Sequence, residues 1–240
     1  MKDLALIMYS HSSYKDVCAP YFSQTDELFD VPKKYIFIDD CDIEVPEGWE
    51  IINYDPSKSY SQRVSDCLSS VDAEYVLFTH EDMFLYSKPN VKKLQKYFDI
   101  LKIYEEMSFV KLIRGTEDIS LPVAEDDSLY WLPENSEYRF AVQPTIWKKS
   151  ILHQIYLNVR VNHIREFEPY ANYYCSSYGI KGAFHFDGEE KRGEHHYDSG
   201  AYPYVATAIV KGKWNLSQYE KELEQILEKN KINCEDRGVA

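Results

Sequence analysis

The stretch EYVLFTHEDMFLYSKPN, residues 74–90, joins a continuous apolar run to a cluster of ionisable side chains. The run Tyr75 to Thr79 is too uniformly apolar for a half-exposed strand, so it predicts a buried strand of a parallel sheet. His80, Glu81 and Asp82 follow it directly. In an open α/β sheet, ligands bind beyond the carboxyl ends of the strands. We therefore expect these three side chains at a ligand site.

Helical segments flank this strand on both sides. Before it, Val64, Cys67, Leu68 and Val71 recur at helical spacing. After it, the apolar residues between 91 and 105 trace one face of a second helix, with Pro89 expected in its first turn. The alternation predicts an α/β fold with a mostly parallel sheet flanked by helices. Three further continuous apolar runs are expected to be strands: Leu4–Tyr9, Tyr35–Ile38 and Phe109–Ile113.

The second half of the chain is less regular. Residues 115–140 are acidic and contain prolines, which predicts a loop-rich insertion over the sheet. We then expect a strand that enters a helix near Trp147, a helix that ends at Gly179, and strands within 182–188 and 204–214. Residues 215–230 predict an amphipathic surface helix. No linker or low-complexity tract interrupts the chain, so we expect one domain over residues 1–240.

Composition excludes several classes of protein. The 240 residues include 27 basic and 40 acidic side chains, a net charge of -13 that disfavours nucleic acid as a partner. The five cysteines are scattered and form no C-x-x-C pair, so neither a disulfide framework nor a zinc site is indicated, and a reducing cytosol is expected. The apolar run at Leu4–Tyr9 is too short for a signal peptide or a transmembrane segment.

Carboxylates at a strand end suit the binding of a divalent cation. The chain has no P-loop, no G-x-G-x-x-G and no nucleophile elbow, so Glu81 and Asp82 most naturally hold a cation that neutralises the phosphates of a ligand. The alternative is that the two residues cap the next helix or lie in a solvated loop.

Taken together, the helix carrying Arg63, the strand that follows it and its acidic end resemble the nucleotide-sugar glycosyltransferases of the GT-A fold, of bacterial or phage type. The resemblance implies a nucleotide-binding half at 1–115, an acceptor half at 116–216, and a C-terminal helix and tail at 217–240. In that family a D-x-D motif holds Mn²⁺ or Mg²⁺ and the diphosphate. Here HED replaces it, so the resemblance assigns the metal to Asp82 and Glu81, with His80 close to the donor.

Two later stretches are similar to other parts of the same family. RFAVQPTIWKKSIL is similar to the acceptor-side strand and helix, which implies that Gln143 contacts the acceptor or the donor sugar. IREFEPYANYY is similar to the helix that carries a catalytic carboxylate, which implies Glu166 or Glu168 as the base of an inverting transfer. Because Glu166 and Glu168 are two residues apart on a helix, their side chains point in different directions and only one of them can face the site. Glu166 is the first choice for the catalytic base. Helix capping and surface ion pairing are the alternatives, and a retaining reaction needs no base.

Several other side chains are candidates for donor binding. Tyr9 and His11 end the first strand, and Asp39 and Asp40 end the strand IFIDD, where the family contacts base and ribose; all four could also be ordinary strand-end residues. Arg63 is expected either to reach a phosphate or to form a surface ion pair with Asp66 or Asp72.

The loop at 185–200 is rich in histidine, carboxylates and glycine. His195 in this loop is a further candidate metal ligand, and a mobile lid without ligands is the alternative.

The sequence thus predicts an enzyme that transfers a sugar from a nucleotide-diphosphate donor to a glycan, lipid-linked or small-molecule hydroxyl acceptor. It is expected in the cytoplasm, and peripheral to the membrane if its acceptor is lipid-linked. The alternatives are a sugar-phosphate nucleotidyltransferase and an inactive sugar- or nucleotide-binding module of the same fold.

Overall fold

The computed structural model describes residues 1–28, 31–40 and 42–240. Within them, the main strands form one nine-stranded sheet in the order β3-β2-β1-β4-β8-β5-β9-β7-β6. Among these nine described strands only β8 and β7 run opposite to the rest, so the sheet is mostly parallel, as predicted. The strands are β1 (Leu4–Tyr9), β2 (Lys33–Asp39), β3 (Trp49–Tyr54), β4 (Tyr75–His80), β5 (Met107–Lys111), β6 (Pro122–Val123), β7 (Asp126–Trp131), β8 (Thr145–Lys148) and β9 (Lys181–His185).

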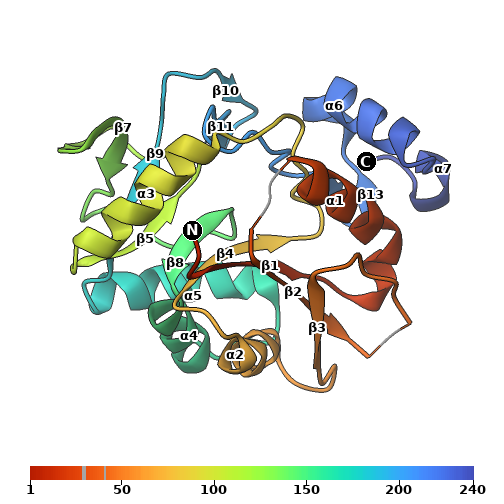
Figure 1. Cartoon of the computed structure of the whole chain (residues 1–240), viewed down its shortest axis with the longest axis horizontal. Coiled ribbons are helices and arrows are strands. Elements are labelled where there is room, and N and C mark those ends of the chain that lie inside the picture. The colour runs from red at the N-terminus through yellow and green to blue at the C-terminus, as the bar shows by residue number, and fades with distance from the viewer. Residues whose placement is uncertain (29–30, 41) are drawn as a thin grey trace.

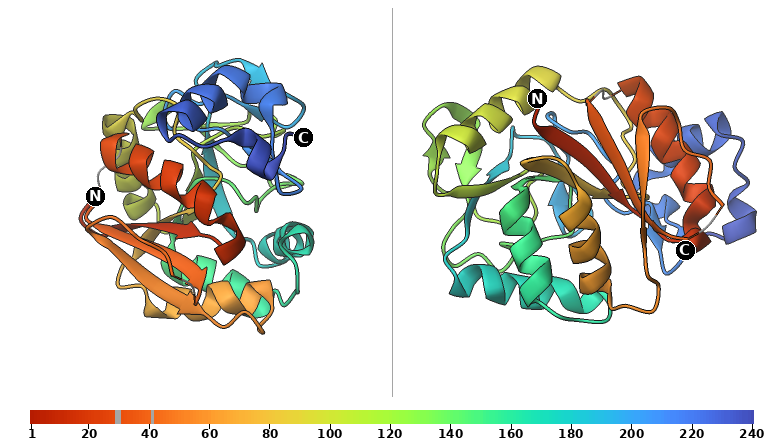
Figure 2. Two further views of the ribbon diagram at one scale, coloured as in Figure 1. Left: turned by 90° about the vertical axis from the view of Figure 1, so that its right-hand side faces the viewer. Right: turned by 60° about the horizontal axis from the view of Figure 1, so that its bottom comes forward.

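Helices cover both faces of the sheet (Figures 1 and 2). In Figure 1, α1, α3 and α6 lie above the sheet and α2, α4 and α5 lie below it. Two short hairpins, β10–β11 and β12–β13, follow β9. The bounds of the helices and hairpins are η1 (Ser12–Tyr14), α1 (Lys15–Leu28), α2 (Tyr60–Ser70), α3 (Val91–Ile103), α4 (Lys149–Asn158), α5 (Ile164–Ser177), α6 (Leu216–Lys229), α7 (Cys234–Arg237), β10 (Lys191–Arg192), β11 (His196–Tyr197), β12 (Ile209–Val210) and β13 (Lys213–Trp214).

Strand β1 shows why its sequence is apolar throughout. Successive side chains of a strand point to opposite faces of the sheet. Leu4, Leu6 and Met8 enter the core beneath α1, α3 and α6, whereas Ala5 and Ile7 enter the core against α2, α4 and α5. A central strand covered on both faces therefore needs apolar residues at every position, which is the signal that identified it.

The glycine signal places the end of α5 correctly, whereas the proline signal misplaces the start of α3. Gly179 has φ +61° and follows α5, as expected for a residue in the left-handed region that ends a helix. Pro89 is a correction, because the Asn90 side chain accepts the Lys93 N–H at 3.1 Å and is the N-cap, so Pro89 lies before α3 instead of inside its first turn.

Two expectations for the second half need revision. The expected loop at 115–140 contains the hairpin β6–β7, and β7 pairs antiparallel with β9, so this segment extends the sheet. The expected strand at 204–214 is the tight hairpin β12–β13. As expected, Leu223 and its neighbours Ile226 and Leu227 on α6 are buried.

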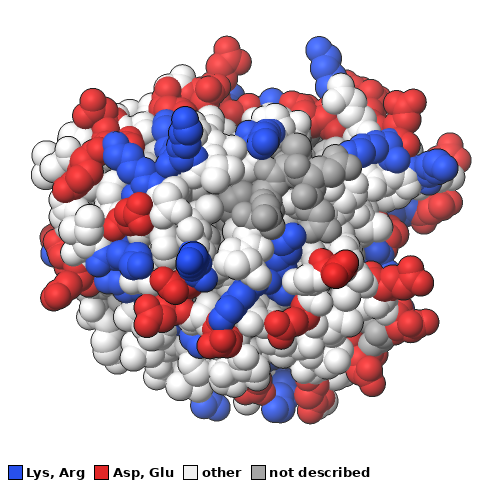
Figure 3. Space-filling view, viewed as in Figure 1, with Lys and Arg blue, Asp and Glu red and all other residues white. Residues whose placement is uncertain are grey.

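Charge is mixed over the surface. On the face shown in Figure 3, the described lysine and arginine side chains are interspersed with aspartate and glutamate, and they form no broad basic area there. Among the described residues, no helix has both the length and the apolar composition that crossing a bilayer requires.

Candidate active site

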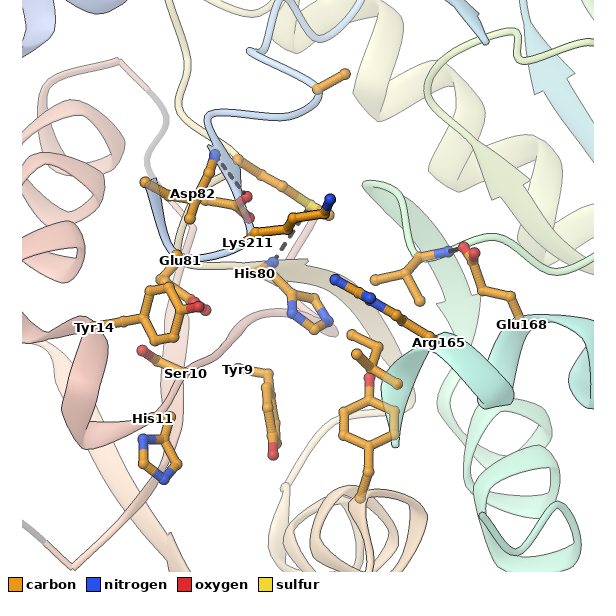
Figure 4. A pocket seen from close by; sticks show the side chains of 17 residues that line it. Tyr9, Ser10, His11, Tyr14, His80, Glu81, Asp82, Arg165, Glu168 and Lys211 are labelled. Carbon is orange, nitrogen blue, oxygen red and sulfur yellow. Dashed lines mark hydrogen bonds between the residues drawn. The ribbon is translucent and has the colours of Figure 1, made fainter. Parts of the chain in front are cut away.

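The site lies beyond the carboxyl ends of β1 and β4. The chain places β2 and β3 on one side of β1 and β4 on the other, so the gap between the ends of β1 and β4 is a topological switch point. Tyr9 and His80, the last residues of these strands, are paired in the parallel register. A cavity of about 520 Å³, which we call the donor cavity because the sequence predicts donor binding at these strand ends, opens there (Figure 4). Its walls come from the ends of β1 and β4, the start of α5 and the hairpin β12–β13.

His80 lies in this cavity as a neutral side chain. Burial lowers the pKa of His80 to about 4, so its imidazole carries no charge near pH 7. The ring lies 5.4 Å from the ring of Tyr9, and within the described residues its Nε2 has no hydrogen-bond partner. A neutral imidazole with a free ring nitrogen can bind a polar ligand or a metal ion.

Glu81 and Asp82 are adjacent in the sequence, and Glu81 is buried whereas Asp82 is half-buried. Burial raises the pKa of Asp82 to about 6, and burial together with the charge of Asp82 raises the pKa of Glu81 well above its ordinary value. The Ile209 N–H donates to Asp82 Oδ2 at 3.3 Å, and Glu81 Oε2 has no hydrogen-bond partner among the described residues. Two such groups bind a proton or a cation readily, because either relieves the repulsion between them.

The donor set fits a hard divalent cation that is shared with a ligand. Among the described residues, no group of three or more His, Cys, Asp and Glu side chains is placed to hold a metal ion on its own. Mg²⁺ is usually bound by one or two carboxylates together with substrate phosphates. Glu81 and Asp82 would supply that number of protein ligands.

Two cationic side chains line the same cavity as the carboxylates. Arg165, in the first turn of α5, and Lys211, in the turn of the β12–β13 hairpin, both line the donor cavity (Figure 4). Lys211 and Gly212 have φ values of 51° and 81°, which is the geometry of a two-residue hairpin turn with two left-handed positions. Sequence reasoning missed both cations, although the Lys-Gly pair between two short apolar segments was an available turn signal.

Arg237 links the β12–β13 hairpin to residues 13–16 on the other side of the cavity. Its guanidinium donates to the Gly212 carbonyl at 3.3 Å and to the Ser13 carbonyl at 2.9 Å, and it forms an ion pair with Asp16. It also lies 4.7 Å from the ring centre of Tyr14, which lines the cavity. The C-terminal helix α7 thus connects two segments that are far apart in the sequence.

Asp39 shapes the first loop from outside the cavity lining. Its carboxylate accepts hydrogen bonds from the Ser12 N–H and hydroxyl, both at 2.6 Å, and His11 Nε2 lies 3.6 Å away. Burial opposes its ionisation, but the hydrogen bonds from Ser12 outweigh that effect and lower the pKa of Asp39. His11 lines the cavity, whereas Asp40 is exposed and does not line it.

Arg63 also lies behind the cavity. It donates to the Lys58 carbonyl at 2.8 Å and lies 5.3 Å from the ring centre of Tyr54. Neither of the expected ion pairs forms, because Asp66 pairs with Lys58 and Asp72 pairs with Lys33. Arg63 supports the aromatic side chains under the cavity and does not line it.

The two candidate bases on α5 face different surfaces. Glu168 lines the donor cavity, and its Oε1 accepts the Val142 N–H at 2.6 Å (Figure 4). Glu166 is exposed and lines a separate groove together with Tyr170. Of the two, Glu168 lines the donor cavity, and Glu166, the first choice, lies outside it. Burial of Phe167 between them fixes which face of α5 turns inward.

Gln143 and His195 line a second cavity of about 270 Å³, and Glu168 lies in the wall that it shares with the donor cavity. The side chain of His195 is 80% exposed, and its Nε2 lies 3.8 Å from Glu194. It does not line the cavity that contains Asp82, so its placement does not support the expected role as a metal ligand.

Comparison with known proteins shows a likeness of fold. No model of a known protein family matches the chain, and no curated protein sequence matches it. The structure is similar to Staphylococcus aureus TarS 1–349 in complex with UDP-GlcNAc, with a TM-score of 0.55 and 11% identity over 82% of this chain and 58% of that one. A second structure of S. aureus TarS 1–349 gives a TM-score of 0.54 at 12% identity over 96% of this chain and 64% of that one.

A third similar structure is CMP:2-keto-3-deoxy-manno-octonic acid synthetase complexed with CTP. It has a TM-score of 0.48 and 10% identity over 76% of this chain and 88% of that one, a likeness too weak to carry an argument. The chain spans less than two thirds of the length of the TarS chains. The GT-A-like fold that the sequence predicted is confirmed.

Proposed function

We propose that the protein is a glycosyltransferase that moves a sugar from a nucleotide-diphosphate donor to a hydroxyl acceptor. The observation that supports this most is the composition of the donor cavity, which is lined both by the carboxyl groups of Glu81 and Asp82 and by the cations Arg165 and Lys211. A diphosphate satisfies both sets of groups at once, because the cations neutralise it directly and a divalent metal joins it to the carboxylates. S. aureus TarS, which shares the fold, binds UDP-GlcNAc.

In this proposal the diphosphate lies between Arg165 and Lys211. Mn²⁺ or Mg²⁺, held by Glu81 and Asp82, would add positive charge where the nucleoside diphosphate departs. The nucleoside lies against the end of β1, where His11 and Tyr14 line the cavity. Asp39 acts indirectly by holding the Ser12 loop in place.

Glu168 is assigned as the base of an inverting transfer. The acceptor hydroxyl oxygen attacks the anomeric carbon, the bond from that carbon to the phosphate oxygen breaks, and the nucleoside diphosphate leaves with the electron pair. The hydroxyl proton passes to Glu168, the carboxylate between the two cavities. Its Oε1 accepts the Val142 N–H, which fixes the carboxylate and leaves Oε2 for the proton.

Thermal unfolding with UDP, GDP, CMP and TDP, each with and without Mn²⁺, tests the proposal. A nucleotide at about 100 times its Kd should add about 2.7 kcal/mol of stability. We expect a metal-dependent shift for one nucleotide that is lost in Asp82→Asn and kept in Asp66→Asn, a control on the surface of α2. A shift with none of the nucleotides refutes the proposal. A shift without hydrolysis of the matching nucleotide sugar identifies an inactive binding module.

A further inference from the structure

The second cavity lies at the carboxyl end of β5, on the far side of Glu168 from the donor cavity. We call it the β5 cavity; it is lined by Lys111, Gly115, Glu117, Tyr138, Gln143 and Glu168, together with Thr116, Ala141 and His195. Its volume of about 270 Å³ is slightly below the roughly 300–1,000 Å³ typical of small-molecule sites. The space therefore suits a single small ring.

Its fixed charges largely cancel. Lys111 and Glu117 form an ion pair, and their side chains are 2% and 0% exposed. Lys111 also donates to the Tyr138 carbonyl at 2.8 Å, and Glu117 accepts the Gly115 N–H at 2.5 Å. A buried ion pair adds little net stability, so its place in a cavity wall is better explained by the rigid polar surface that it provides. Besides this ion pair, the wall contains the carboxylate of Glu168, which disfavours an anionic ligand, and the largely exposed imidazole of His195.

Gln143, a residue that lines the cavity, has an acceptor atom that lacks a donor. Gln143 Oε1 is shielded from solvent, and within the described residues it has no hydrogen-bond partner. A buried polar atom left unpaired costs free energy that a ligand recovers by donating to it. Hydroxyl groups can donate, whereas ionised phosphate and carboxylate oxygens only accept. The amide oxygen of Gln143 and the carboxylate of Glu168 thus both favour a ligand that carries hydrogen-bond donors, and hydroxyl groups are donors of this kind.

We propose that the β5 cavity binds the acceptor and that the acceptor unit is a neutral, hydroxyl-rich ring such as a hexose. The assignment of this ligand as the acceptor rests on the proposed glycosyl transfer, because only a transferase needs a hydroxyl at Glu168 from one side and a donor sugar from the other. The binding itself follows from the cavity. Gln143 binds a hydroxyl group that does not react, and Glu168 accepts the proton of the hydroxyl group that does.

Ligand-observed saturation-transfer NMR on the full chain tests the binding without any nucleotide. The probes are the methyl glycosides of glucose, galactose, mannose and N-acetylglucosamine, with glucose 6-phosphate and glucuronate as anionic counterparts. The main variant is Gln143→Leu, which removes the unpaired oxygen at similar volume and is expected to unfold at the same temperature as the wild type or higher. Gln154→Ala, at an exposed glutamine of α4, is the control.

We expect at least one neutral glycoside to bind the wild type and the control, and to bind Gln143→Leu about tenfold more weakly. We expect the anionic sugars to bind the wild type more weakly than the neutral ones do. No signal from any neutral glycoside, with UDP absent or present, overturns the proposal. Equal binding to Gln143→Leu, or preference for the anionic sugars, also overturns it. Failure of the nucleotide experiment above with retained glycoside binding would refute the transferase and leave the sugar site.

Discussion

Exchanging each carboxylate of α5 for its amide separates catalysis from folding. In Glu168→Gln the new side chain keeps an oxygen that can accept the Val142 N–H, now at 2.6 Å from Glu168 Oε1. Only the charge on that hydrogen bond is lost, so the free energy of unfolding should fall by about 1 kcal/mol. The amide has no basic oxygen that can take a proton. Loss of a general base lowers the rate by about 10²–10⁴-fold, equivalent to about 2.7–5.5 kcal/mol of transition-state stabilisation.

The assay is sugar transfer from the donor identified by thermal shift, with urea unfolding measured on the same samples. Glu166→Gln is the matched control, two residues away on an exposed face of the same helix. It should keep transfer within twofold of the wild type. The reasoning is refuted if Glu168→Gln keeps more than half of the wild-type rate, or if Glu166→Gln loses as much as Glu168→Gln.

Three further predictions concern the walls of the donor cavity. Lys211→Gly should raise the free energy of unfolding by about 1 kcal/mol, because glycine adopts φ 51° without strain, and it should weaken nucleoside-diphosphate binding measured by calorimetry. The control is Lys231→Gly, at φ 57° outside the cavity lining, which should stabilise the protein equally and leave binding unchanged. Arg237→Ala should lower the free energy of unfolding in urea by about 1–3 kcal/mol, because the β12–β13 hairpin loses its hydrogen bond to the Arg237 guanidinium. It should also weaken nucleoside-diphosphate binding. Unchanged affinity would contradict the role of Arg237 in holding the hairpin. Asp39→Asn should have a lower free energy of unfolding than the wild type at pH 7. Because the pKa of Asp39 is lower in the folded than in the unfolded protein, this difference in stability should shrink as the pH falls below about 4. A constant difference in stability from pH 7 to pH 2 would show that the charge of Asp39 does not stabilise the fold.

The sequence predicted the centre of the sheet better than its edge. The strands β1 and β4 are covered on both faces, so nearly every residue is apolar and the pattern is plain. The edge strand β3, Trp49–Tyr54, has a mixed pattern of buried and exposed side chains and was not recognised. The hairpin β6–β7 was interpreted as a loop for a similar reason, because only part of it is buried. Edge strands lack the signal that burial on two faces imposes.

The site shows the same division between local and long-range information. The motif at the end of β4 could be placed from sequence, because the position of a ligand site relative to parallel strands is a general rule. The helical period shows only that the side chains of Glu166 and Glu168 point in different directions. Which of them faces the cavity depends on how α5 packs against the rest of the protein. Arg237 could not be found at all from sequence, since its partner Asp16 is 221 positions away.

The question raised by the end of β4 is why a buried strand should lead into His80, Glu81 and Asp82. Without a ligand these groups are costly, because Glu81 Oε2 and His80 Nε2 are shielded from water and lack partners within the described residues. A side chain that only capped a helix or solvated a loop would be hydrogen-bonded or exposed. Arg165 and Lys211 lie across the cavity and do not form ion pairs with the carboxylates in the described structure, so both sides stay available to a third group. In the proposed function, an anion that brings its own cation would satisfy all of them, and a metal-bound diphosphate has that chemistry.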